Sequence, residues 1–198
     1  MILTMNNKKL MWILLAVIIV FAGFNIFTFF NNRQNYEQVE FSATYTFEKG
    51  LKTEIENTVL FSYEKESDMQ ESLEYFNGVT KEEKMTNYKE VLTKLEEQSE
   101  RPIELLEYDA FAYMDNGMLR IEEVNVVTGM VRETEDGWET DFGENRLELK
   151  EDSNSKLVFI FPEDANIISA NPEPTEKVGN VLTWKNVGEI KFPNVEYK

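Results

Sequence analysis

The chain of 198 residues contains neither cysteine nor histidine. Without cysteine no disulfide can form, so the hydrophobic core alone must hold the fold together. Without histidine, the commonest general base and the commonest metal ligand of proteins are both missing. Nucleophilic triads of the serine–histidine and cysteine–histidine kinds are therefore excluded. No other catalytic motif takes their place, and we expect neither catalytic residues nor a cofactor.

Positively charged residues are also few, since 20 Lys and Arg stand against 37 Asp and Glu. All the acidic residues follow Phe30, and with the 18 basic residues there they give residues 31–198 a formal net charge of −19. A field of that sign repels nucleic-acid phosphates and anionic lipid headgroups. We therefore expect no nucleic-acid partner, and we interpret the charge as a means of keeping the chain soluble.

A long uncharged run, Leu10-Phe30, lies close to the start of the chain. Its 21 residues would form a helix about 31 Å long, which matches the ~30 Å hydrocarbon core of a bilayer. Lys8 and Lys9 precede the run and Arg33 follows it, so the positive-inside rule places the N-terminus in the cytoplasm. The sequence thus predicts a single-pass protein of the cell membrane with cytoplasmic residues 1–9, a transmembrane helix at 10–30, a short tether at 31–38 and an extracytoplasmic domain at 39–198.

Two other interpretations of the run stay open. A cleaved signal peptide would have a shorter apolar stretch with small residues after it, whereas this run ends in Thr28, Phe29 and Phe30. A type IV pilin would carry an acidic residue early in its apolar helix, and none occurs here before Glu37. We therefore expect a retained anchor.

The rest of the chain has the pattern of a β domain. Apolar and polar residues alternate over Val39–Phe47 and over Ile55–Tyr63, which predicts two half-buried strands joined as a hairpin. Asn116–Gly117 and Asp136–Gly137 are strong turn signals, and before the first of them Leu106, Tyr108, Ala110 and Ala112 alternate. Further strands are predicted at Leu119–Val127, Arg146–Lys150, Lys156–Phe161, Asn166–Ala170, Val181–Trp184 and Ile190–Tyr197.

Helical spacing replaces this alternation at about residues 67–99. Ser67–Gln70 and Thr80–Glu83 both have the sequence of a capping box, and each precedes apolar residues at helical spacing. We expect two helices that pack on their own sheet, with partner binding as the alternative. The fold class predicted is α+β, mainly β: an N-terminal transmembrane helix followed by one β-sandwich-like extracytoplasmic domain with a two-helix insertion.

The end of the chain carries a recognisable pattern: Phe161–Asp164, Asn171–Pro174, Gly179–Trp184 and a final strand to Tyr197. This resembles the β-sandwich ending of an uncharacterised family of single-span, membrane-anchored surface proteins of archaea and some thermophilic bacteria. The resemblance implies an anchored β-sandwich domain and brings no activity or site residue with it. On physical grounds we expect Trp184 in the core, with Pro172 and Pro174 in an extended crossover between sheets. A sugar-stacking Trp184 is the alternative.

The acidic stretch Glu133–Glu144 places six carboxylates and two glycines in twelve positions. Calcium prefers six to eight oxygen ligands on a flexible loop, so Asp136, Glu139, Asp141 and Glu144 are candidate ligands. The spacing is not that of an EF-hand, and a solvated hairpin explains the stretch equally simply. Paired carboxylates could also serve a hydrolase of the glycosidase type.

These observations favour a membrane-anchored, non-enzymatic extracytoplasmic domain that acts through contacts with an unknown protein partner, in the cell envelope or as an accessory subunit. An extracytoplasmic ligand- or calcium-binding module is the alternative, and a carboxylate-based hydrolase is a third hypothesis. A binding module or an enzyme should have a concave pocket, whereas an interaction domain should expose an apolar patch.

The predicted topology can be tested with epitope tags at Met1 and Lys198. Because we expect the N-terminus inside, protease added to intact cells should remove the tag at Lys198 and spare the tag at Met1. Immunoblots of the two tags provide the measurement. Recovery of a soluble form that begins near Asn31 would show that the run is a cleaved signal peptide.

Overall fold

The computed structural model describes residues 36–198, apart from positions 50, 144 and 152. The predicted cytoplasmic segment, transmembrane helix and most of the tether lie outside the described residues. Within the described part, neither helix is long and apolar enough to cross a membrane. The first strand begins at Tyr36, three residues before the predicted start at Val39.

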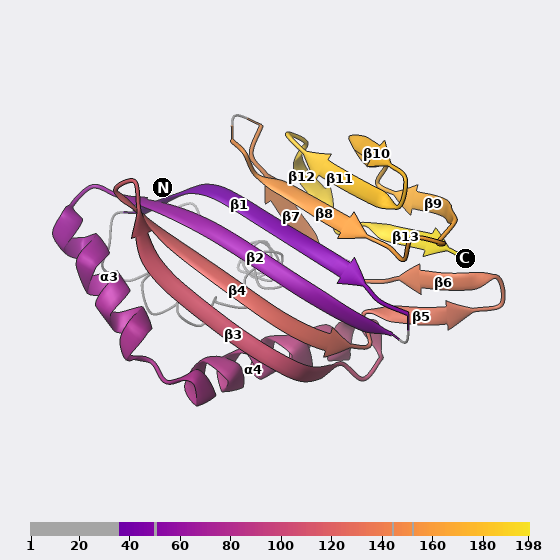
Figure 1. Ribbon diagram of the computed structural model, residues 1–198, viewed down its shortest axis with the longest axis horizontal. Helices are drawn as coiled ribbons and strands as arrows, with labels where there is room; N and C mark the ends of the chain where they lie inside the picture. The colour runs from indigo at the N-terminus through magenta and orange to yellow at the C-terminus, as the bar shows by residue number, and fades with distance from the viewer. Residues whose placement is uncertain (1–35, 50, 144, 152) are drawn as a thin grey trace, which may run out of the picture.

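A seven-stranded sheet is the largest element of the domain (Figure 1). Its strand order is β10-β11-β8-β1-β2-β4-β3, in which β1 and β8 are parallel and the other neighbours antiparallel. The strands are β1 (Tyr36–Phe47), β2 (Lys52–Tyr63), β3 (Glu104–Asp115), β4 (Met118–Thr128), β8 (Lys156–Ile160), β10 (Glu176–Val178) and β11 (Val181–Lys185).

Two smaller sheets complete the β structure. One has four strands in the order β5-β6-β13-β9, and the other pairs β12 with β7. Their bounds are β5 (Val131–Thr134), β6 (Gly137–Thr140), β7 (Arg146–Leu149), β9 (Ile167–Asn171), β12 (Gly188–Lys191) and β13 (Asn194–Tyr197). The prediction of a mainly β, α+β domain with a two-helix insertion is therefore confirmed, and its several sheets are compatible with the predicted β-sandwich-like arrangement.

The two helices are α3 (Glu66–Gly78) and α4 (Lys81–Ser99). The predicted capping box of α4 is present, because the Thr80 hydroxyl accepts from the Glu83 backbone N–H and the Glu83 carboxylate accepts from the Thr80 N–H. The predicted capping box of α3 is wrong. That helix begins at Glu66, so Ser67 already lies inside its first turn, where its hydroxyl donates to Asp68 instead.

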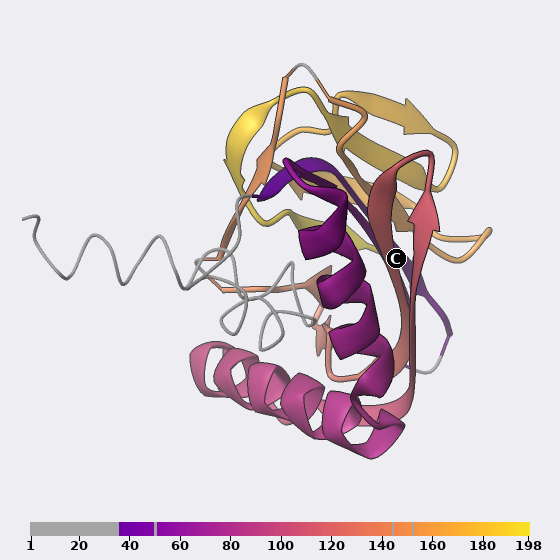
Figure 2. The same cartoon turned by 90° about the vertical axis from the view of Figure 1, so that its left-hand side faces the viewer.

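All the other layers lie against one face of the large sheet. The alternation in β1 places Phe41, Tyr45 and Phe47 on this inner face, where they are almost fully buried. Over β1 and β8 the rings of Phe142 and Phe192, from the segments of the small sheets, pack against Tyr45. Figure 2 shows α3 and α4 on one side of the sheet, next to β2, β3 and β4. The opposite, outer face carries no described helix or sheet (Figures 1 and 2).

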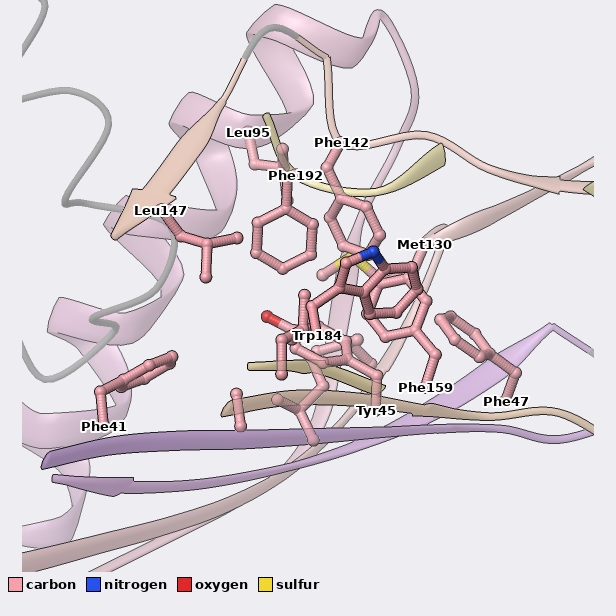
Figure 3. Packing of buried hydrophobic residues seen from close by; sticks show 14 of the residues in the cluster. Phe41, Tyr45, Phe47, Leu95, Met130, Phe142, Leu147, Phe159, Trp184 and Phe192 are labelled. Atoms are coloured by element: carbon pink, nitrogen blue, oxygen red, sulfur yellow. The ribbon is translucent and has the colours of Figure 1, made fainter. Parts of the chain in front are cut away.

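Trp184 lies at the centre of the aromatic core (Figure 3). Its ring has no exposed surface, and its centroid lies 5.2 Å from that of Phe159 in an edge-on arrangement. The indole N–H donates to the Pro172 carbonyl at 3.0 Å, which ties the crossover from β9 to β10 to the core. The core prediction is confirmed. A buried ring has no free face for a sugar, so the stacking alternative is wrong.

Three strand predictions need correction. The single strand predicted over Ile190–Tyr197 is two strands in different sheets, because Phe192 and Pro193 lie between β12 and β13. The short strand β10 was not predicted. In β3 a bulge between Leu105 and Glu107 shifts the register, so Leu106 is exposed whereas Leu105 and Tyr108 face inward.

The core position of Trp184 predicts a large loss of stability on truncation. Trp184→Ala should lower the free energy of unfolding by about 3–5 kcal/mol, because it removes a buried aromatic ring and leaves a cavity. Half-buried Trp138 provides a matched control, and Trp138→Ala should cost less. Urea unfolding monitored by circular dichroism measures both. A loss below about 1 kcal/mol for Trp184→Ala would contradict the packing described here.

Candidate functional site

The predicted calcium ligands lie along the β5–β6 hairpin and the segment after it. Asp136 is in the turn, where its carboxylate lies 3.8 Å from the Lys198 ammonium and both side chains are largely exposed. Glu139 belongs to β6 and Asp141 follows it, while Glu144 lies outside the described residues. The described residues contain no group of three carboxylates placed to hold one metal ion.

Arginines already face two of these candidates. Arg132 Nε donates to Glu139 at 2.7 Å and Asn194 donates to its other oxygen at 2.7 Å, so both carboxylate oxygens are engaged. The hydrogen bond to Glu139 raises the pKa of Arg132. Asp141 accepts from the Gly143 N–H at 2.9 Å, and its backbone carbonyl accepts from the Arg101 guanidinium. A calcium ion here would have to compete with fixed positive charges.

A buried polar cluster under the helices was missed by the sequence analysis. On the inner face of β4, Glu123 accepts from the Tyr108 hydroxyl at 2.9 Å and Asn125 accepts from the Tyr88 hydroxyl at 2.8 Å. Glu123 is 4% exposed and Asn125 is fully buried. Burial raises the pKa of both tyrosines well above the usual value, and the Glu123 charge adds to the effect. The phenols therefore stay protonated and act as donors.

Lys84 of α4 adds a positive charge at the border of this cluster. Its ammonium lies 4.0 Å from the centre of the Phe76 ring, a cation–π contact between the two helices. Burial lowers the pKa of Lys84, while Asp109 and Glu123 act to raise it. Tyr88 and Lys84 of α4 thus hold the helix against the sheet, Tyr88 by a hydrogen bond to Asn125 and Lys84 by electrostatic attraction to Asp109 and Glu123.

The cluster does not have the form of an active site. The cavity beside it measures about 10 Å³, room for roughly one water molecule, and most of its lining is apolar. Tyr88 is the one member of the cluster that reaches this cavity. Since a substrate needs a pocket of several hundred Å³, we interpret these polar groups as structural.

The alternation of residues in β4 predicts this cluster once the register between β3 and β4 is known. In β4 the inward positions are Leu119, Ile121, Glu123, Asn125 and Val127, while the valines between them face outward. The Asn116–Gly117 turn sets this register and places Tyr108 opposite Asn125. Judged by hydrophobicity alone, Val124 and Val126 would be assigned to the inner face. The register set by the Asn116–Gly117 turn places them on the outer face instead.

Several large exposed apolar side chains lie on the strand at one edge of the seven-stranded sheet. Nine large hydrophobic residues of the described part are well exposed, and four of them belong to the edge strand β3: Leu106, Phe111, Tyr113 and Met114. Phe111 is 53% exposed, the highest value of the four. Tyr113 also stands on the outer face, where its hydroxyl donates to Glu122 of β4 at 2.9 Å. No prediction from the sequence singled out this edge.

The charges around the acidic hairpin predict no specific calcium effect. Calcium and sodium at matched ionic strength should shift the melting temperature alike, because both screen the same negative field. Asp136→Asn combined with Asp141→Asn should leave this equality unchanged. Differential scanning calorimetry provides the measurement. A shift seen with calcium alone and abolished by the two substitutions would establish a site, since a bound ion stabilises only the folded state.

The buried tyrosines predict a loss of stability in alkali. Below about pH 10 both folded and unfolded states keep the phenol protons. Above it the unfolded chain loses them first, because burial raises the folded-state pKa of Tyr88 and Tyr108. Stability should then fall by up to ~1.4 kcal/mol per pH unit for each such tyrosine. Tyr88→Phe should flatten this slope in urea unfolding between pH 9 and 11, whereas an unchanged slope would contradict the burial of Tyr88.

Comparison with known proteins places the whole described domain in one family. Residues 36–198 match the family model described as a domain of unknown function, DUF4897. A search of curated proteins gave no match. The match begins at the first residue of β1 and runs to the last residue of the chain, so the large sheet, the helical insertion and the small sheets form one family unit. The chain belongs to the DUF4897 family.

Proposed function

We propose that this chain is a membrane-anchored interaction protein whose β domain lies outside the cytoplasm and binds another protein. Leu10-Phe30 would hold it in the bilayer, and the acidic domain would begin close to the membrane surface, because β1 starts six residues after the run. The partner would belong to the cell envelope or to a larger complex in which the chain is an accessory subunit.

The apolar edge at β3 is the observation that carries this proposal. A soluble domain normally scatters its exposed hydrophobic residues singly, and a concentration of them marks a contact surface. Phe111 and Tyr113 stand side by side on the outer face of β3, and that face carries no described layer (Figure 1). Burial in a complex would stabilise both rings, and aromatic residues are typical of interface centres.

The surroundings of the two rings suit a contact surface better than a catalytic or metal site. Arg120 of β4 lies between the carboxylates of Asp115 and Glu122, 3.4 and 2.7 Å away, so the charges nearest Tyr113 are already paired. Paired charges orient a partner and exclude wrong ones at moderate desolvation cost. The described residues of the acidic hairpin have no comparable concentration of exposed apolar side chains, and two of its carboxylates already face cations, Glu139 facing Arg132 and Asp136 facing Lys198.

Photocrosslinking at two matched positions tests the proposal. Benzoylphenylalanine would replace Phe111 at the β3 edge, or Val178 at the β10 edge, and Val178 is 64% exposed at the opposite end of the same sheet. After irradiation of intact membranes, we expect discrete adducts from position 111 and few from position 178. Adducts of equal yield at both positions, or none at 111, would contradict a contact surface at β3.

A further inference from the structure

We propose that β3 binds its partner by strand addition, and that the partner supplies an extended segment with basic residues flanking an apolar centre. This inference rests on the proposed function, since it names the kind of partner that the β3 surface would take. The incoming segment would pair antiparallel to β3 and become an eighth strand of the large sheet.

The backbone of β3 is suited to pairing. It is the terminal strand of the sheet, with β4 on one side and no described strand on the other. From Glu107 to Asp115 it pairs with β4 in regular register, so the opposite row of N–H and C=O groups is also regular. The Ala110 N–H donates to the Asp109 carboxylate at 3.1 Å, and an incoming strand would replace this local bond. Proteins usually protect long edge strands with proline, lysine or bulges. Residues 104–115 contain no proline and no lysine, and their one bulge lies near the start, at Leu105–Glu107.

Charge decides what kind of strand can pair. The outer-face positions of the regular part run Glu107, Asp109, Phe111, Tyr113, Asp115, which places two aromatic rings between acidic residues. Residues 36–198 carry a formal net charge of −20 (17 basic, 37 acidic). A second copy of this chain would bring the same negative charge to the edge and be repelled. Two of these carboxylates already have ion pairs within the chain: Asp109 lies 3.5 Å from the Lys81 ammonium and Asp115 lies 3.4 Å from Arg120. Ion pairs at an exposed surface are weak, so a segment with Lys or Arg at these positions would still be attracted, most strongly opposite Glu107.

The side chains set the pattern of the incoming strand. On the outer face, apolar residues of the partner would lie opposite Phe111 and Tyr113, and basic ones opposite Glu107, Asp109 and Asp115. The inward-facing residues of this part of β3 are Tyr108, Ala110, Ala112 and Met114, and the two alanines leave space for side chains of moderate size. From its N-terminus, an antiparallel partner would therefore have basic, apolar, apolar, basic and basic residues at every second position, all on the outer face.

A synthetic peptide with the sequence Lys-Thr-Val-Thr-Val-Thr-Lys-Thr-Lys is the probe. It has this pattern, with threonine at the inward positions because threonine favours strands. The full chain in a non-ionic detergent is titrated against the fluorescein-labelled peptide, with binding followed by anisotropy. Hydrogen–deuterium exchange of the same complex reports on residues 104–115. One control peptide replaces each lysine with glutamate, and another carries N-methylated amides throughout, which cannot form a β-ladder.

Strand addition predicts a specific set of results. The basic peptide should bind and slow exchange in 104–115, the glutamate peptide should bind about tenfold or more weakly, and the N-methylated peptide should not bind. Glu107→Lys should weaken binding of the basic peptide by about fivefold. Glu176→Lys on β10 makes the same charge change at the opposite edge and should have no effect.

Other results would overturn the inference without deciding the proposed function. Equal binding of the N-methylated peptide would mean docking on the outer face without strand pairing, and equal binding of the glutamate peptide would remove the role of charge. No binding of the basic peptide, or a dimer of the chain in sedimentation, would remove the proposed partner class. The crosslinking at positions 111 and 178 tests independently whether the β3 edge contacts a protein at all.

Discussion

The burial of one face of the seven-stranded sheet is the constraint on which the rest of the structure depends. Strand β1 contributes Phe41, Tyr45 and Phe47 to this face, and β8 adds Phe159 from the adjacent parallel position. At roughly 25 cal/mol per Å² of apolar surface, four such rings contribute about 15–25 kcal/mol to the favourable part of the folding free energy. Both helices and both small sheets are therefore recruited to one side, which leaves the outer face of the sheet open to contacts.

The inner face is divided between two kinds of packing. Over β1, β8 and β11 it is aromatic, with Trp184 edge-on to Phe159. Under α4 it includes hydrogen-bonded groups, such as Tyr88 with Asn125 and Tyr108 with Glu123. Because buried hydrogen bonds require a fixed geometry, these hydrogen-bonded groups determine how α4 lies against β4. They thereby support the neighbouring edge strand β3.

The sequence allowed good prediction wherever a local rule decides the structure. The β1–β2 hairpin follows from alternation, the start of α4 from the Thr80–Glu83 capping box, and the β3–β4 hairpin from Asn116–Gly117. Prediction was weaker where a tertiary feature decides. The bulge at Leu105–Glu107 and the break at Phe192–Pro193 move residues between faces or sheets, and neither has a strong local signal.

The candidate surface could not be predicted because it depends on strand order. Phe111 and Tyr113 alternate with alanines in the sequence, so period alone does not say which set faces the helices. Only the position of β3 at the sheet edge makes their exposure meaningful. The composition of Glu133–Glu144 suggested a metal site. In the fold, however, the Arg132 guanidinium donates to the Glu139 carboxylate and the Arg101 guanidinium donates to the Asp141 carbonyl.

Hydrogen–deuterium exchange of the chain in its native membranes, compared with the purified chain, tests the central claim most directly. If the β3 edge is the contact surface, amides of residues 104–115 should exchange more slowly in the membranes, while those of 176–178 in the opposite edge strand should exchange at the same rate in both samples. Equal exchange of residues 104–115 in the two samples would contradict the account.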